Sequence, residues 1–293
     1  MLETGKPRVA FLGTGLMGQP MAERLLAQGY PLLAYNRTGE KTQTLRTSGA
    51  EIVETPVEAI RQADCVVLML AHAAAIQDVV FSQEARSELS TRTVIQMGTI
   101  GPSESQEFQR KVNAAGGDYL EAPVLGSIPQ AEVGGLIVMV GASREQFEQW
   151  SPLLHCLGPD PLLIGPVGKA ATLKLALNQL IASLTVGFAL SLGMVQHEGL
   201  SVDQFMDILR GSALFAPTFE KKLPQMVSGN YENPNFPTRH LLKDVDLILN
   251  TVQEMGLDAS GLMGIRTLLE KTMNRGWADA DYSALFDTLI SES

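Results

Sequence analysis

The sequence predicts an α/β domain with a doubly wound, mainly parallel sheet, followed by an all-α domain that a long helix joins to it. Short apolar runs alternate with amphipathic stretches over the first half of the chain, and beyond Pro166 the strand-like runs stop. Strands that are apolar along their whole length and alternate with helices are typical of a parallel sheet covered on both faces. We therefore expect two domains, residues 1–165 and 166–293.

Six apolar runs of the first domain are candidate strands. They cover residues 8–13, 31–36, 65–70, 93–98, 118–123 and 135–142. Amphipathic stretches such as 17–29 and 102–116 lie between them and predict the helices that cover the sheet.

The second domain has a helical pattern throughout. Residues 168–198 form one stretch of about thirty residues, roughly 45 Å long at the helical rise, which is typical of a spine between domains or in a subunit interface. Ser201 and Gln204 have the spacing of a capping box that opens the next helix. Further helices are predicted at 238–255, 260–275 and 281–290.

Composition excludes several classes of function. The 293 residues are 45% hydrophobic and 18% charged, with a net charge of −10, which argues against a nucleic-acid partner. No apolar run reaches about 20 residues without a polar break, so we predict no membrane span. The N-terminus lacks the pattern of a signal peptide, and Cys65 and Cys156 both lie in apolar contexts. These features predict a cytoplasmic protein with reduced cysteines.

A glycine-rich turn follows the first predicted strand. Gly13, Gly15 and Gly18 have the GxGxxG spacing, directly before a predicted helix. In that context the glycines allow a tight turn, close approach of a pyrophosphate and tight helix packing, which predicts a Rossmann dinucleotide-binding domain. Leu16 and Met17 inside the turn, and Leu70 at the end of a later strand, are further candidate cofactor contacts. A glycine turn without a ligand is the alternative.

The end of the second strand indicates which dinucleotide binds. An NAD-preferring domain carries an acidic residue there, but this chain has Asn36, Arg37 and Thr38. A guanidinium and two small hydrogen-bonding groups suit a ribose 2′-phosphate, so we predict NADPH. Arg37 as an ordinary solvated turn residue is the alternative.

Lys174 interrupts the apolar pattern of the long helix. On a helical wheel it shares a face with Val167, Ala170, Ala171, Asn178, Ile181 and Thr185. Four leucines fall on another side and are expected to pack, namely Leu173, Leu177, Leu180 and Leu184. Small residues with two polar groups at i and i+4 predict a cavity wall. The spacing equally allows a lysine that extends its ammonium group into solvent.

Four segments together resemble one enzyme family. VAFLGTGLMGQPMAERL, EAPVLGS, GPVGKAATLKLALNQL and FPTRHLLKDVDLIL are similar to motifs of the β-hydroxyacid dehydrogenases, relatives of 3-hydroxyisobutyrate and 6-phosphogluconate dehydrogenases, and extend over about residues 8–285. The resemblance implies a Rossmann domain, a helical domain and an active site in the cleft between them. It also implies that Lys174 is the general acid in reduction and the general base in oxidation, and that Asn178 positions the substrate.

Other positions follow from the same motifs. Gly126 and Ser127 match the family's substrate loop, where backbone amides could bind a carboxylate as an anion nest. Leu125 stands where the family usually has a serine, so no hydroxyl contact is expected there. Thr99 matches a cofactor contact, and Lys243, next to Asp244, would reach the nicotinamide ribose or the substrate. His240 receives no role, and the remaining histidines show no metal-ligand spacing, so we expect no metal site.

The segment 211–244 most resembles the NADPH-dependent glyoxylate and succinic semialdehyde reductases. Ser212, Phe219 and Phe236 would then line the pocket for a small aldehyde that bears a carboxylate, or for the product hydroxy acid. The alternatives are a 3-hydroxyisobutyrate or other β-hydroxyacid dehydrogenase, an imine reductase, or a noncatalytic NADP-binding sensor. The family usually forms homodimers or homotetramers through the helical domain, so an oligomer is expected. The role of Lys169 remains open.

Overall fold

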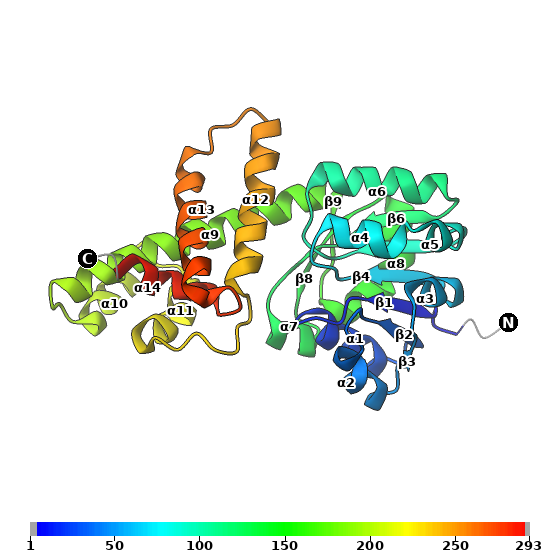
Figure 1. The fold of residues 1–293 in the computed structure, drawn as a ribbon, viewed down its shortest axis with the longest axis horizontal. Coiled ribbons are helices and arrows are strands. Elements are labelled where there is room, and N and C mark those ends of the chain that lie inside the picture. The colour runs from blue at the N-terminus through cyan, green and yellow to red at the C-terminus, as the bar shows by residue number, and fades with distance from the viewer. Residues whose placement is uncertain (1–4, 291–293) are drawn as a thin grey trace. The chain divides into compact units, whose positions relative to one another are not determined.

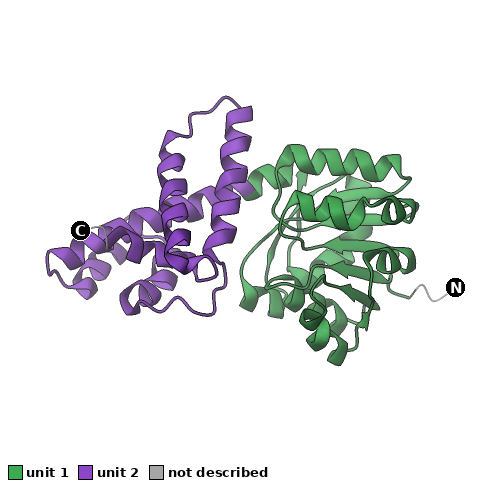
Figure 2. Cartoon of the chain, in the orientation of Figure 1, with its two compact units in different colours: residues 1–174 green, residues 175–293 purple. Residues whose placement is uncertain are grey.

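The computed structural model describes residues 5–290 and divides into two compact units (Figure 2). Unit 1 ends at Lys174 and unit 2 begins at Leu175. The sequence placed the division at 165/166, ahead of the long helix, whereas the change of unit falls inside helix α9 (Lys169–His197).

Unit 1 is built on a nine-stranded sheet of order β3-β2-β1-β4-β5-β6-β8-β7, with β9 paired to β8 (Figure 1). The pairs are parallel except β6 with β8 and β7 with β8. This confirms the doubly wound, mainly parallel sheet of a Rossmann domain. The strands are β1 (Val9–Leu12), β2 (Leu32–Tyr35), β3 (Glu51–Ile52), β4 (Cys65–Leu68), β5 (Thr93–Gln96), β6 (Asp118–Glu121), β7 (Val124–Leu125), β8 (Ile137–Gly141) and β9 (Leu162–Gly165).

Each face of this sheet has its own core, because successive strand side chains point to opposite faces. Val9 and Phe11 of β1 belong to one buried cluster, and Ala10 and Leu12 belong to the other. The first face is covered by the helices α1 (Gly18–Ala27), α2 (Gln43–Thr47), α7 (Ile128–Val133) and α8 (Arg144–Leu157). The second face is covered by α3 (Pro56–Gln62), α4 (Ala73–Val80), α5 (Gln83–Ser87) and α6 (Pro102–Ala114). A short 3-10 turn, η1 (Gly39–Thr42), precedes α2.

The six predicted strands all form, somewhat shorter than their apolar runs. Sequence reasoning missed β3, β7 and β9. The first two are only two residues long, too short for a period of two to be visible.

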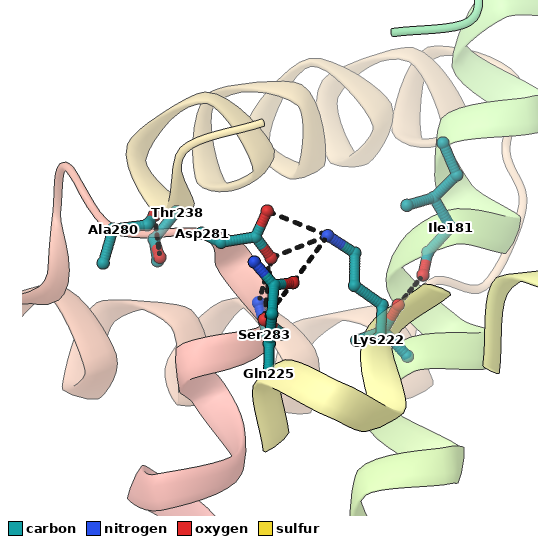
Figure 3. A network of polar contacts seen from close by, with 8 residues as sticks. Ile181, Lys222, Gln225, Thr238, Ala280, Asp281 and Ser283 are labelled. Carbon is teal, nitrogen blue, oxygen red and sulfur yellow. Dashed lines mark hydrogen bonds and ion pairs between the residues drawn. The ribbon is translucent and has the colours of Figure 1, made fainter. Parts of the chain in front are cut away.

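The regular elements of unit 2 are helices joined by turns, as predicted, apart from one isolated bridge between Pro237 and Asp281. After α9 come α10 (Val202–Arg210), α11 (Pro217–Ser228), α12 (Thr238–Glu254), α13 (Ser260–Thr272), η2 (Met273–Trp277), η3 (Tyr282–Ala284) and α14 (Leu285–Ile290). Ser201 begins α10 as predicted, since its hydroxyl accepts from the Gln204 amide at 3.3 Å. A network of polar contacts around Lys222 and Asp281 joins α11 to the segment before η3 (Figure 3).

Two of the four leucines that were expected to pack on one side of α9 are exposed, whereas Leu173 and Leu177 are half-buried. Leu180 and Leu184 are 51% and 37% exposed, whereas Lys174, Asn178 and Thr185 on the opposite side are buried. Both sides of this helix are apolar in sequence, so the pattern alone could not decide which side faces the core.

Helix α9 is apolar enough to resemble a membrane span, although its sequence contains no unbroken apolar run of about 20 residues. Among residues 5–290, α9 is the one helix long and apolar enough to cross a membrane. The core helix of a globular domain passes the same test, and Phe188, Ala189 and Leu192 of α9 lie in the buried cluster of unit 2.

Candidate active site

The glycine turn between β1 and α1 is built for close packing on one side and for a ligand on the other. Gly13 has φ +100°, and a Cβ there would lie 2.5 Å from the Met69 carbonyl oxygen. A Cβ on Gly18 would lie 1.9 Å from the Gly13 oxygen. Gly15 is exposed, with nothing within 4 Å of its Cβ position. These are the separate requirements that a dinucleotide pyrophosphate imposes on the three glycines.

The start of α1 is also suited to an anion. Met17 is its N-cap residue and no side chain caps the helix, so the amides of the first turn have no side-chain acceptor. Leu16 is 43% exposed beside them. A hollow of about 350 Å³ adjoins the turn, lined by Thr14, Gly15, Leu16, Gln19, Pro20, Glu23, Lys41, Ile128 and Glu132.

Asn36 has a role in the protein that the sequence did not reveal. Its Nδ2 donates to Thr14 Oγ1 at 3.0 Å, and its Oδ1 accepts from the Thr38 amide at 2.9 Å. Thr14 in turn donates to the Lys41 carbonyl at 3.2 Å. Asn36 therefore ties the end of β2 to the glycine turn and to the Thr38 amide through its two amide atoms. Arg37 and Thr38 are exposed at this strand end, where a 2′-phosphate would lie.

Leu70 and Thr99 follow β4 and β5, whose carboxyl ends lie at the same sheet edge as the glycine turn. A Cβ on Gly13 would lie 2.9 Å from Leu70 Cδ2, so the structure brings these two predicted residues together. Thr99 is half-buried between β5 and the Gly101 N-cap of α6.

The predicted anion nest has one of its two amides engaged within the protein. Gly126 has φ +140°, and a Cβ there would lie 2.7 Å from Leu136 Cδ2, so the turn requires glycine. The Ser127 amide and hydroxyl, however, both donate to Gln130 Oε1, at 3.0 and 2.7 Å. This capping arrangement begins α7 and uses the amide that was expected to bind a carboxylate.

Asn178 lies one helical turn after Lys174 in α9 and is held by a residue distant in sequence. Its Nδ2 donates to Asp244 Oδ2 of α12 at 2.6 Å. An ionised carboxylate only accepts hydrogen bonds, so the Asn178 NH₂ group must face Asp244. Asn178 Oδ1 is thereby left as a buried acceptor that receives no hydrogen bond from the described residues. Lys174 and Asn178 are 9% and 2% exposed.

Asp244 is the residue of this contact that sequence reasoning left without a role. In the sequence, the Lys243-Asp244 pair was the feature that could have pointed to Asp244. In the structure, Lys243 Nζ lies 2.7 Å from Asp244 Oδ1. Lys243 is thus placed beside the Asn178–Asp244 contact within unit 2. Its predicted contact with cofactor or substrate remains a prediction.

The three predicted pocket residues of unit 2 make contacts within that unit, and their role in a substrate pocket remains a prediction. Ser212 donates to the Leu209 carbonyl at 2.8 Å and accepts from the Leu214 amide at 3.2 Å, which shapes the turn after α10. The buried Phe219 ring stacks on Phe188 with centroids 4.7 Å apart. Phe236 is half-buried before α12, its ring 5.7 Å from that of Tyr282.

His240 of α12 is a titratable group near Asp244 whose pKa is shifted. Burial and the nearby Arg239 and Lys243 lower the pKa of His240, against the opposing effect of Asp244. Within residues 5–290, no three His, Cys, Asp or Glu side chains gather in a way that could hold a metal ion.

Comparison with known proteins agrees with this architecture. A family described as the NAD binding domain of 6-phosphogluconate dehydrogenase matches residues 8–165, and one described as NAD-binding of NADP-dependent 3-hydroxyisobutyrate dehydrogenase matches residues 168–289. The chain is 31% identical to glyoxylate/succinic semialdehyde reductase 1 of Arabidopsis thaliana, over 96% of this chain and 98% of that protein.

Two further likenesses extend over nearly the whole chain. It is 30% identical to 2-hydroxy-3-oxopropionate reductase of Escherichia coli, over 96% of this chain and 97% of that protein. A 3-hydroxyisobutyrate dehydrogenase structure from Mycobacterium tuberculosis has the same fold, with a TM-score of 0.87, 22% identity and coverage of 97% and 99%. The glycine turn, the helical second unit and these matches show that the chain is a nicotinamide-dependent oxidoreductase and belongs to the β-hydroxyacid dehydrogenase family.

Proposed function

We propose that this protein uses NADPH to reduce a small aldehyde bearing a carboxylate, such as glyoxylate or succinic semialdehyde, to the corresponding hydroxy acid. The observation that carries the proposal is the buried pair on α9, in which Asn178 presents an open acceptor one turn from Lys174. The names of the Arabidopsis and Escherichia coli relatives both describe reduction of small aldehyde acids, which supports this substrate class.

The residues of unit 1 fit a dinucleotide. The open Gly15 backbone and the uncapped start of α1 would hold the pyrophosphate, and Arg37 would pair with a 2′-phosphate. Reduced nicotinamide supplies a hydride when it is bound.

Lys174 would supply the proton. As the carbonyl carbon gains a hydride, its oxygen becomes an alkoxide, which a lysine Nζ can protonate. In its ammonium form, Lys174 Nζ carries the proton that the alkoxide takes up. Asn178 Oδ1 would accept a hydrogen bond from the product hydroxyl or from the ammonium, and so fix the reacting atoms in one geometry.

The substrate carboxylate would bind at the Gly126–Ser127 turn. Because Gln130 occupies the Ser127 amide, the anion must displace this side chain or use other donors of the same turn. Replacing one acceptor by a charged one strengthens the hydrogen bond from the Ser127 amide, which favours the exchange.

The test is NADPH oxidation with glyoxylate, succinic semialdehyde and 2-hydroxy-3-oxopropionate. We expect turnover with at least one of them, and a fall in kcat of about 10²- to 10⁴-fold for Lys174→Ala, the usual contribution of a general acid. NADPH affinity should remain, because Lys174 acts on the substrate. Lys221→Ala, at an exposed lysine of α11, is the matched control and should keep the wild-type kcat.

The alternatives give different results in the same assay. Oxidation of 3-hydroxyisobutyrate with NAD would favour that dehydrogenase, and reduction of cyclic imines alone would favour an imine reductase. NADPH binding without turnover of any substrate would favour a noncatalytic sensor and contradict the proposal.

A further inference from the structure

A buried carboxylate that the mechanism above does not use lies at the start of α9. Glu121, the last residue of β6, is 1% exposed. Its Oε1 accepts from the amides of Gly168 and Ala171, at 2.8 and 3.0 Å. These amides belong to the residue before α9 and to its first turn. Glu121 therefore caps α9 from a strand of the sheet, 47 residues away in sequence from Gly168.

The other oxygen of this carboxylate is held from α6. Ser105 Oγ donates to Glu121 Oε2 in a short hydrogen bond, and Tyr119 Oη lies 2.8 Å from Ser105 Oγ. Ser105 has one hydroxyl hydrogen, which goes to Glu121, so Tyr119 donates to Ser105. All three side chains are fully or almost fully buried. A Cβ on Gly141 of the neighbouring strand β8 would lie 2.5 Å from Glu121 Oε1. The carboxylate therefore fits only because residue 141 is a glycine.

We propose that Glu121 is a positioning residue for Lys174, which fixes the first turn of α9 and thereby the place of the lysine. The proposal rests on the role assigned to Lys174 above. Lys174 lies three residues after Ala171, about 4.5 Å along the helix. A shift of α9 by one residue in register would rotate the lysine by about 100° about the helix axis.

The way in which α9 begins differs from the other helix starts of unit 1. Helices α3 and α8 are capped by their own N-cap residues, Thr55 and Ser143, which are exposed and local in sequence. The start of α9 instead depends on β6 and α6, and Gln106 of α6 also donates to the Val167 carbonyl at 3.3 Å. A carboxylate is costly to bury, and burial raises the pKa of Glu121. A local serine cap would satisfy the same amides without that cost, but it would not fix the helix to the sheet.

The first experiment separates an effect on the chemical step from an effect on binding. We expect Glu121→Ala to lower kcat for the accepted aldehyde by about 10- to 100-fold, because a misplacement of about 1 Å costs that much, with an unchanged dissociation constant for NADPH. Glu121→Gln keeps an oxygen for both amides and should restore kcat to within about threefold. A Glu121→Gln enzyme as slow as Glu121→Ala would overturn the proposal.

The second experiment asks whether Glu121 acts through the lysine. In a Lys174→Ala enzyme, the further change Glu121→Ala should leave the residual rate unchanged, because there is no lysine to misplace. An equal loss in both backgrounds would mean that Glu121 acts independently of Lys174, and the proposal would fail. Ser143→Ala, which removes the cap of α8, is the matched control and should keep the wild-type kcat at a lowered Tm.

A third measurement needs no substrate. Amide hydrogen exchange of residues 168–174 should become faster in Glu121→Ala than in wild type, with the strands unchanged, and Glu121→Gln should restore protection. If wild type turns over no aldehyde, the proposed function fails while this result still decides the positioning role. Where Glu121→Ala does not fold, Ser105→Ala takes its place. It should lower kcat about threefold and speed the same amides, and an unchanged exchange pattern would contradict the proposal.

Discussion

Asn36 and Arg37 are neighbours in sequence, but the Asn36 side chain is hydrogen-bonded within the protein and the Arg37 side chain is exposed. The Asn36 side chain is bonded to Thr14 and Thr38, whereas Arg37 is exposed at the end of β2. We expect Arg37→Asp to weaken NADPH binding by about 10- to 100-fold more than NADH binding, because a charge-assisted contact contributes about 1.5–3 kcal/mol. Binding titrations with both cofactors at one salt concentration measure this.

Asn36→Ala provides the control for this prediction. It removes the tie between β2 and the glycine turn, which both cofactors need, so it should weaken NADH and NADPH alike. Equal effects of Arg37→Asp on the two cofactors would exclude Arg37 as the selecting residue.

His240 makes stability depend on pH in a defined direction. Its pKa is lowered in the folded protein by burial, and by Arg239 and Lys243. The unfolded chain, with a histidine pKa near 6.5, therefore takes up a proton before the folded protein does. Stability should fall as the pH drops below about 6.5, towards the folded pKa. The stability of wild type relative to His240→Gln should be lower at pH 5.5 than at pH 7.5 in urea unfolding, and a constant difference would contradict this.

A buried ion pair of unit 2 joins α11 to the segment before η3 (Figure 3). Lys222 Nζ of α11 lies 2.7 and 2.8 Å from the two Asp281 oxygens, and Asp281 also accepts from the Ser283 amide and hydroxyl. Lys222→Met leaves a buried carboxylate without its cation, so we expect a loss of about 3–5 kcal/mol. Equilibrium unfolding in urea measures it, and an unchanged midpoint would contradict the buried pair.

Removing both charges should cost less than removing one. Lys222→Met with Asp281→Leu leaves no buried charge, so part of the stability should return. The lost hydrogen bonds of Ser283 set the part that does not return.

The accuracy of the element predictions followed the strength of the local signal. All six long apolar runs became strands, and α9, α12 and α13 lie within two or three residues of their predicted bounds. The short strands β3 and β7 carry too few residues to show a period. The prediction of which side of α9 is buried was only partly right, because apolar residues occur on both sides of the helix. Contacts with other elements determine which side faces the core.

For the whole molecule, we expect self-association through unit 2. Leu180, Leu184 and Met194 of α9 recur at helical spacing on one side and are exposed, as are Gly187 and Ser191 between them. An apolar stripe of this kind on a helix typically packs against another chain. Light scattering should give at least twice the chain mass, and Leu184→Glu with Met194→Glu should give a monomer. A monomeric wild type would contradict the prediction.

The sequence by itself determined the fold class, the order of most elements, the glycine turn and the two polar residues of α9. Each of these features rests on patterns of residues that are close together in the sequence. The tertiary structure alone decided that Asp244 orients Asn178 across 66 residues, that Glu121 caps α9, and that Gln130 occupies the Ser127 amide. These contacts depend on which buried donors and acceptors packing brings together, and no period along the chain encodes that choice.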